Sequence, residues 1–397
     1  MAVAAAEGTG DSRSWRSLLY NQQLRQFVYQ ALTVIFLAWL IWYASTNAAQ
    51  NLAKANMTTS FSFLNGRSGF DIAQTPIQYS SDSTYFRALV LGLINTLIVA
   101  IAGIITATIV GLLVGIGRLS HNWLIAKLST VYVEVFRNIP PLLVIFFWYK
   151  GVLSLLPDVK KALSLPLSVY VSNRGIFMPA PVFGAAFWIV PIAFVLGVVG
   201  AIGYTRWANR RQLATGKRPP VLLVNLGLIV GLPLIAFAVA GFPVAFDVPV
   251  LGKFNMNGGT VVGPEFLSLY MALSFYTAAF IAEIVRAGIR GVSKGQSEAA
   301  HALGIRPGLT TRLVVLPQAL RIIIPPLTSQ YLNLTKNSSL AVAIGYADLV
   351  AVGGTILNQS GHSIEIIGIW MVIYVSLSLV TSLFMNWFNA RMALVER

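Results

Sequence analysis

Side chains able to do chemistry are sparse in this chain, and their spacing gives no sign of catalysis. The sequence has no cysteine and three scattered histidines, which excludes thiolate nucleophiles and cysteine-ligated metals. The carboxylates Glu134, Glu283 and Glu365 fall in three separate apolar stretches, so no acid–base pair is indicated. No glycine-rich run ends in Gly-Lys-Ser/Thr, the signature of a phosphate-binding loop. We therefore expect no catalytic residue, no metal and no cofactor bound by this chain.

A polar patch interrupts one of the apolar stretches. Lys336, Asn337, Ser338 and Ser339 follow Pro325-Pro326 in an otherwise apolar segment. Polar groups inside a membrane are costly and often functional. The patch either lines a pathway or forms hydrogen bonds between helices, and we favour the pathway.

Two further charged positions are candidates for a gate. Glu283 and Arg286 are three residues apart and share a helix face, so pairing with each other or with the neighbouring loop is the simpler interpretation. Arg137 either serves a gate or extends its side chain to the membrane interface, with Glu134 as a candidate partner. Pro140-Pro141 should break the helix that carries Arg137.

Composition identifies the elements that must position these residues. Of the 397 residues, 56% are apolar and 10% are charged, whereas soluble chains carry roughly 25% charged residues. The mean hydropathy is +0.73. The chain is therefore predicted to be an all-α integral membrane protein, since helices satisfy their own backbone hydrogen bonds in lipid. Its formal net charge of +15 is explained by membrane topology and does not indicate nucleic-acid binding.

Eight stretches are long and apolar enough to span a bilayer, which requires about 20 residues. They are residues 27–45, 88–117, 131–153, 182–204, 221–243, 266–289, 322–345 and 366–388. The polar, basic segment 205–220 is predicted to be a loop between two of them. Glycines in the second stretch suit close helix packing, because small residues let helix backbones approach; they are Gly92, Gly103, Gly111, Gly115 and Gly117.

The distribution of basic residues predicts the orientation. With the N-terminus in the cytoplasm and eight alternating spans, 18 Lys and Arg residues fall inside and 8 outside, as the positive-inside rule requires. Both termini are thus expected in the cytoplasm. The first stretch resembles a signal peptide in its short apolar core, but no small-x-small cleavage site follows it, so an uncleaved anchor is favoured.

These features divide the chain into a core and additions. The predicted parts are a cytoplasmic N-terminus (1–26), a first span with a periplasmic segment (27–87), core spans (88–181), an inserted two-span hairpin (182–243), further core spans (244–390) with a loop at 291–317, and a cytoplasmic tail (391–397).

The loop at 291–317 has the pattern of two short helices. Ser293 and Gln296 have capping-box spacing, Gly304 suits the left-handed position that ends a helix, and Pro307 suits the start of a second helix, expected to end near Pro317. The alanines between Ser293 and Gly304 either favour helix in a simple connector or fit the helix into a groove of another protein. The residues alone leave both open.

Four ordered motifs carry a family resemblance. Glu298-Ala299-Ala300, Gly304, Val314 and Leu316-Pro317 reproduce the spacing EAA-x3-G-x9-I-x-LP, with valine in place of isoleucine. This pattern resembles the EAA motif of ABC importer permeases. Residues 279–288, 136–142 and 336–340 are similar to AYIAEIVRGG, FRGTPLL and LKDTSL of the polar amino-acid branch, with several departures in the second. The first span, residues 46–87 and the hairpin depart from the usual five-span subunit, and that enlarged layout resembles a permease subunit of general L-amino-acid importers.

The resemblance implies a binding-protein-dependent amino-acid importer in a bacterial inner membrane. Two permease subunits, often a heterodimer, form the pathway, two cytoplasmic ATPase subunits bind ATP, and a periplasmic binding protein delivers the amino acid. It implies that Glu298, Ala299, Ala300 and Gly304 belong to a coupling helix that docks on the ATPase. The alternatives are a stand-alone secondary transporter and a membrane-embedded enzyme. The first would show inverted repeats or midplane carboxylates and the second a cluster of reactive groups, and neither is evident.

Overall fold

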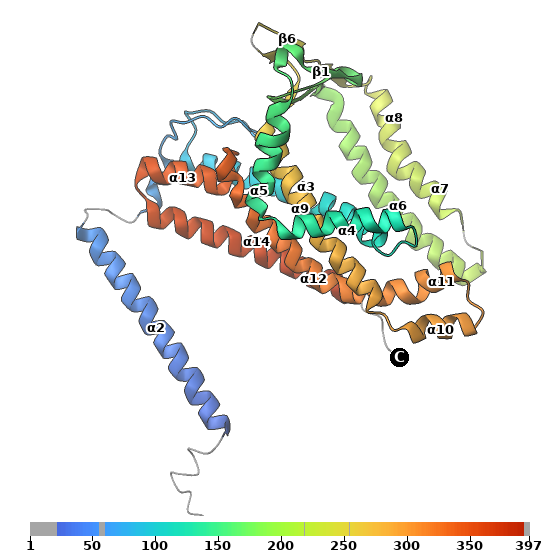
Figure 1. The fold of residues 1–397 in the computed structure, drawn as a ribbon. Coiled ribbons are helices and arrows are strands. Elements are labelled where there is room, and N and C mark those ends of the chain that lie inside the picture. The colour runs from blue at the N-terminus through green and yellow to red at the C-terminus, as the bar shows by residue number, and fades with distance from the viewer. Residues whose placement is uncertain (1–21, 55–59, 218, 254, 393–397) are drawn as a thin grey trace, which may run out of the picture. The chain divides into compact units, whose positions relative to one another are not determined.

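A computed structural model describes residues 22–54, 60–217, 219–253 and 255–392. The chain divides into two units, residues 1–64 and 65–397, which are described separately. The first contains α2 (Gln22–Lys54). The α-helices of the second (Figure 1) are α3 (Tyr85–Gly117), α4 (Trp123–Asn138), α5 (Pro141–Phe146), α6 (Ile189–Thr215), α7 (Val221–Leu226), α8 (Leu232–Val239), α9 (Pro264–Arg290), α10 (Lys294–Ala302), α11 (Pro307–Thr310), α12 (Leu316–Asn337), α13 (Leu349–Ser360) and α14 (Ser363–Met392).

Shorter helical turns and strands complete the described part of the chain. The π-helical turns are Phe147–Val152, Gly227–Gly231 and Thr311–Val315, and the 3₁₀ turns are Phe61–Asn65, Leu153–Leu155, Val159–Lys161, Pro166–Ser168, Ala185–Trp188 and Ser338–Ile344. The strands are β1 (Leu163–Leu165), β2 (Val169–Ser172), β3 (Gly175–Met178), β4 (Ala180–Phe183), β5 (Val244–Asp247), β6 (Val250–Leu251), β7 (Met256–Asn257) and β8 (Thr260–Val262).

The number of spans agrees with the hydropathy pattern. Within the described residues, six helices are long and apolar enough to cross a membrane, and the number rises to eight if each of two bent helix pairs is one span. The chain is therefore a mostly helical, multi-pass membrane protein. Most boundaries lie several residues outside the predicted ones, because helices continue beyond the hydrocarbon region into polar sequence.

Neither bent pair is the straight helix that its apolar stretch predicts. The predicted span 131–153 is Trp123–Asn138 and Pro141–Leu155, which meet at 111°. Proline lacks a backbone N–H and disfavours helix in the residue before it, so Pro140-Pro141 breaks the helix as expected. The predicted span 322–345 belongs to Pro307–Ile344, followed by Leu349–Ser360 at 52°. There the break is at Gly345, which has a left-handed backbone (φ +75°).

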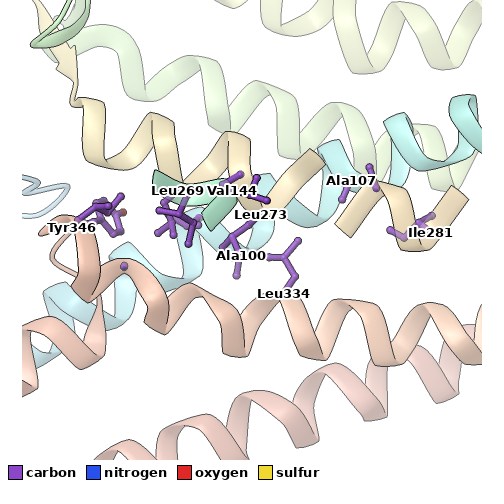
Figure 2. Close-up of a cluster of buried hydrophobic side chains, with 14 of the residues drawn as sticks. Ala100, Ala107, Val144, Leu269, Leu273, Ile281, Leu334 and Tyr346 are labelled. Carbon is purple, nitrogen blue, oxygen red and sulfur yellow. The ribbon is translucent and has the colours of Figure 1, made fainter. Parts of the chain in front are cut away.

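The core of the second unit is built on α3 and α9, which pack closely along their length (Figure 2). Gly111 and Gly115 make this approach possible: a Cβ on Gly111 would lie 2.6 Å from Cβ of Ile281, and one on Gly115 would lie 2.8 Å from the carbonyl oxygen of Ala282. Lipid supplies no hydrophobic force between helices, so close van der Waals packing must hold them. The predicted packing role of these glycines is confirmed.

Hydrogen bonds between helices add to this packing. The hydroxyls of Thr106 and Tyr270 join α3 to α9 at 2.7 Å, and those of Thr108 and Tyr331 join α3 to α12 at 2.9 Å. The three helices thus form one packed group.

Small antiparallel sheets, which the hydropathy pattern did not predict, lie on either side of the α6–α8 hairpin in the sequence. One has the strand order β1-β2-β3-β8, and two further pairs are β4-β5 and β6-β7. In the β4-β5 pair Phe183 is opposite Val244, so the chain leaves and re-enters the hairpin at one place. The strands have two to four residues, too few to show a clear alternation of apolar and polar side chains.

The prediction of a loop at 205–220 is wrong for most of that segment. Helix α6 continues to Thr215 and ends where Gly216 adopts φ +72°. The polar residues after Tyr204 interrupt the apolar run but not the helix, because arginine, glutamine and alanine are good helix formers.

Candidate functional site

The loop between α9 and α12 contains the predicted short helix. Helix α10 ends at Leu303 and Gly304 with two hydrogen bonds: the N–H of Gly304 donates to the carbonyl oxygen of His301 (2.9 Å), and the N–H of Ile305 donates to that of Ala300 (3.0 Å). This is a Schellman motif, which requires a left-handed residue after the helix. Gly304 has φ +72°, so the predicted helix end is confirmed.

Two details of this loop differ from the prediction. Ser293 precedes α10, but its side chain makes no capping hydrogen bond. The second helix does not end near Pro317. The π-helical turn Thr311–Val315 leads directly into α12, whose first turn contains Pro317. Proline has no backbone N–H to donate, and Pro317 lies just after the π-helical turn, where the regular α-helical hydrogen-bond pattern is interrupted.

The faces of α10 differ in exposure. Ala300 is buried and holds the helix against the neighbouring turns, whereas Glu298 and Ala299 are exposed. Gln318 Nε2 donates to Gln296 Oε1 at 3.2 Å and fastens the start of α10 to α12. The sequence reasoning missed Leu303, whose side chain is 79% exposed at the end of α10. A leucine at the end of a short, alanine-rich helix could have been recognised from the sequence as a possible contact residue.

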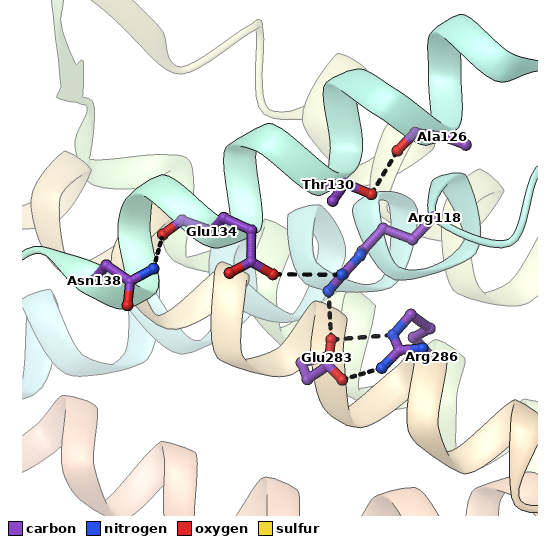
Figure 3. A network of polar contacts seen from close by, with 7 residues as sticks. All are labelled: Arg118, Ala126, Thr130, Glu134, Asn138, Glu283 and Arg286. Carbon is purple, nitrogen blue, oxygen red and sulfur yellow. Dashed lines mark hydrogen bonds and ion pairs between the residues drawn. The ribbon is translucent and has the colours of Figure 1, made fainter.

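A network of charged side chains joins three helices (Figure 3). Glu283 on α9 accepts hydrogen bonds from Arg286 on the same helix, with Nε to Oε2 at 3.1 Å, and from Arg118 at the end of α3. A second nitrogen of Arg118 lies 3.7 Å from Glu134 on α4. The Arg118 and Glu283 side chains are 10% and 24% exposed, so little water screens their contact, whereas Glu134 is 55% exposed and its contact with Arg118 is open to solvent. The predicted Glu283–Arg286 pair is confirmed.

The network differs from the prediction in the partner of Glu134, and it includes Arg118, which the sequence reasoning did not single out. Glu134 contacts Arg118, not Arg137 as expected. The guanidinium of Arg137 instead lies 5.7 Å from the ring centre of Phe280 on α9, a cation–π geometry. Arg118 was missed because it follows the apolar stretch and looks like an ordinary interfacial residue, and only the fold brings α3, α4 and α9 together.

The structure separates the four residues of the polar patch. Ser338 is buried and its hydroxyl donates to the carbonyl oxygen of Thr335 (2.7 Å), and the hydroxyl of Ser339 donates to that of Lys336 (2.8 Å). Asn337 is half-buried, while Lys336 at the end of α12 is exposed. The two hydroxyls are therefore satisfied by their own backbone, and the lysine carries the exposed charge.

Lys336 continues a polar stripe on α12. Ser329, Asn333 and Lys336 are all exposed, and their spacing of four and three residues places them on one face of the helix. An asparagine and a lysine facing lipid would be costly. This face of α12 must therefore meet water or another protein.

The described residues around these helices do not form a cluster of catalytic or metal-binding side chains. Among the described residues, no group of three or more His, Asp or Glu side chains could hold a metal ion. The charged groups Arg118, Glu134, Glu283 and Arg286 contact one another and join α3, α4 and α9.

Comparisons with known proteins agree on one family. The model of the family described as "binding-protein-dependent transport system inner membrane component" matches residues 219–394. The general L-amino acid transport system permease protein of Rhizobium johnstonii is 64% identical over 388 residues, covering 98% of this chain and 97% of that protein. The glutamate/glutamine/aspartate/asparagine transport system permease protein of Rhodobacter capsulatus is 43% identical over 413 residues, covering 96% of each. Among solved structures, an amino acid ABC transporter with histidines is 20% identical, with a TM-score of 0.46 over 77% of this chain and 95% of that one.

Proposed function

Since this chain belongs to the family of inner-membrane permease subunits of binding-protein-dependent ABC transport systems, we propose that it carries amino acids into the cell. It is a multi-pass, non-catalytic subunit of an ABC importer. The observation that carries the substrate class is the 64% identity, over 98% of the chain, to a general L-amino acid permease. The secondary-transporter alternative has no support from these relatives.

The partners follow from the same proposal. A second, homologous permease subunit completes the pathway, ATPase subunits bind ATP on the cytoplasmic side, and a periplasmic protein delivers the amino acid. The chain has no phosphate-binding loop of its own, which supports a separate ATPase. We infer that both termini and α10 face the cytoplasm, in line with the excess of basic residues there.

Helix α10 is proposed to be the docking element for the ATPase. Its exposed face carries Glu298, Ala299 and Leu303, which together offer a charge, a small surface and an apolar contact. Ala300 and Gly304 keep the helix fixed to its own chain, one by burial and the other by the Schellman turn. A docked α10 can therefore transmit the movement of the ATPase to α9 and α12.

The polar network is proposed to stiffen this connection. Arg286 lies one turn before the end of α9, and Glu283 links it to Arg118 at the end of α3. A displacement of α10 thus reaches α3 and α4 as well as α9. Glu283 acts in this proposal as a joint near the pathway, and Arg137, held over Phe280, as a candidate gate residue.

The pathway is proposed to follow the exposed stripe of α12. Lys336 offers a cation that suits the carboxylate shared by all amino acids, and Asn333 and Asn337 offer neutral donors and acceptors. The buried Ser338 and the half-buried Ser339 shape the turn behind Lys336 through their bonds to the backbone.

The test is amino-acid uptake by the complete complex in proteoliposomes, with binding protein added outside and ATP inside. Uptake of labelled amino acids that stops without ATP or binding protein is expected. Glu298→Gln should reduce uptake while ATPase activity persists, and Lys336→Met should reduce uptake without weakening assembly. Lys294→Gln, at an exposed position of α10 outside the motif, is the control. ATP-independent uptake by the chain alone would refute the proposal.

A further inference from the structure

The end of α6 carries an unneutralised cluster of positive charge. Arg206, Arg210 and Arg211 follow the apolar part of this helix, and all three are exposed. The sequence contains no carboxylate between Asp158 and Asp247. Within the described residues none of the three arginines forms an ion pair. The described part of the chain therefore does not balance this charge, which a bound anion could do.

The spacing of the cluster favours a bound anion. Arg206 and Arg210 are four residues apart on one helix face, where like charges repel. Arg211 lies with its guanidinium 5.2 Å from the ring centre of Trp207, so its position is held by a cation–π contact. Tryptophan prefers the membrane–water interface, which puts the cluster at the depth of lipid headgroups.

A shallow, open apolar groove lies at the start of α7, which packs against α6. It has a volume of about 600 Å³ and is lined by Pro219, Pro220, Val221, Leu222, Leu223 and Asn225. Asn225 Nδ2 donates to the hydroxyl of Thr205 at 2.8 Å, and Thr205 directly precedes Arg206. The basic end of α6 and the start of α7 therefore lie side by side, which suits a ligand with an anionic head and an apolar tail.

We propose that the basic end of α6 and this groove bind an anionic phospholipid. The phosphate lies among Arg206, Arg210 and Arg211, where guanidinium groups provide paired donors to its oxygens. An acyl chain lies against Leu222 and Leu223. The proposal concerns the hairpin alone and holds whichever solute the transporter carries.

The surroundings favour a lipid over an acidic protein or a free phosphate. Leu222 and Leu223 are 81% and 70% exposed at the start of the candidate span Val221–Val239, so they face the acyl chains of the bilayer, where a lipid held by the arginines would place its own tail. The helix is also continuous with a candidate membrane span, Ala185–Thr215, which brings the cluster to the bilayer surface. Basic residues in such a position attract anionic lipid at about 1 kcal/mol each.

Native mass spectrometry of the purified full-length chain tests the proposal by titration with phosphatidylglycerol, phosphatidylcholine and inorganic phosphate. The wild type should retain phosphatidylglycerol at least tenfold more tightly than phosphatidylcholine. The variant R206Q/R210Q/R211Q should lose about 100-fold in phosphatidylglycerol affinity, since each basic residue contributes roughly fivefold. The control K160Q/K161Q/K253Q removes the same charge from exposed lysines elsewhere and should match the wild type.

A second variant distinguishes binding of the lipid headgroup from binding of the acyl chain. L222S/L223S keeps the arginines and should weaken phosphatidylglycerol binding while leaving inorganic phosphate binding unchanged. The proposal is overturned if the wild type does not distinguish the two lipids, a comparison that needs no variant. It is also overturned if inorganic phosphate displaces phosphatidylglycerol at equal concentration, or if the lysine control loses as much affinity as the arginine variant.

Discussion

At the scale of single residues, Gly304 is needed for its backbone conformation and not for lack of space. Its φ is +72°, and a Cβ built on it would meet no atom within 4 Å. Alanine should therefore add only conformational strain, about 1 kcal/mol, and no steric clash. Asparagine adopts the left-handed conformation more readily than other non-glycine residues.

We predict that Gly304→Ala weakens the coupling of ATP hydrolysis to transport and that Gly304→Val weakens it more, whereas Gly304→Asn remains close to the wild type. The strain would loosen the Schellman turn and let α10 shift on its own chain. The measurement is the ratio of amino-acid uptake to ATP hydrolysis in proteoliposomes. Equal ratios for valine and asparagine would remove the conformational explanation.

Glu283 is the single anion that two arginines of this network share. Its side chain contacts both Arg118 and Arg286. Removing the carboxylate takes the hydrogen-bond acceptor from two partly buried cations and leaves Arg118 only the 3.7 Å contact with Glu134, which costs more than the loss of the pair itself.

We predict that Glu283→Gln destabilises the protein by about 2 kcal/mol, below the full cost of a buried pair because the Glu283 side chain is 24% exposed. Arg286→Gln should lower the stability by less, since Glu283 would still form its ion pair with Arg118. The double variant should be less destabilised than the sum, because it removes one cation together with the anion. The midpoint of thermal unfolding in detergent reports this order, and strictly additive effects would argue against a shared carboxylate.

At the scale of elements, the close contact between α3 and α9 requires glycine at position 111, because any larger side chain would clash. A Cβ there would lie 2.6 Å from both Cβ and Cγ2 of Ile281, closer than such atoms can approach. Gly203 on α6 has no atom within 4 Å of its Cβ position, so the same substitution meets no obstacle there.

We predict that Gly111→Ala destabilises the folded protein by about 2 kcal/mol through overpacking, whereas Gly203→Ala is neutral or slightly stabilising, since alanine favours helix. Combining Gly111→Ala with Ile281→Ala should recover little of the loss, because alanine at position 281 keeps the Cβ at 2.6 Å and the carbonyl oxygen of Ala278 would still lie 2.9 Å away. The readout is the temperature at which the detergent-solubilised chain aggregates. A Gly111→Ala protein as stable as the Gly203→Ala protein would show that α3 and α9 do not approach this closely.

At the scale of the whole molecule, orientation in the membrane is open to direct measurement because the chain contains no cysteine. Ser164 on β1 and Gln212 on α6 are both exposed and are predicted to lie on opposite sides of the membrane. Ser164→Cys should react with a membrane-impermeant thiol reagent added to intact spheroplasts, and Gln212→Cys should react only after lysis. Labelling of both in intact cells would contradict the inferred topology.

The hydropathy pattern was sufficient for the class of protein and the approximate number of spans, and Gly304 predicted the end of the short helix in the loop at 291–317. These features depend on local sequence: a backbone in lipid must form its own hydrogen bonds, and Gly304 marks the end of α10 by its own conformation. Membership of the permease family was likewise readable from Glu298, Gly304 and their neighbours. The division into core, first span and insertion, and the roles of the site residues, stay predictions.

Only the tertiary structure decided which distant groups meet. The pairing of Glu134 with Arg118, the contact of Arg137 with Phe280 and the strand pair that closes the hairpin each join residues far apart in the chain. The bend of 52° after Ile344 and the helical continuation of α6 also escaped the hydropathy pattern. Hydropathy measures the transfer of each segment into lipid one at a time, whereas the contacts depend on which neighbours the packed helices bring within reach. The bend and the continuation of α6 have local causes that hydropathy does not measure, the left-handed backbone of Gly345 and residues that favour helix.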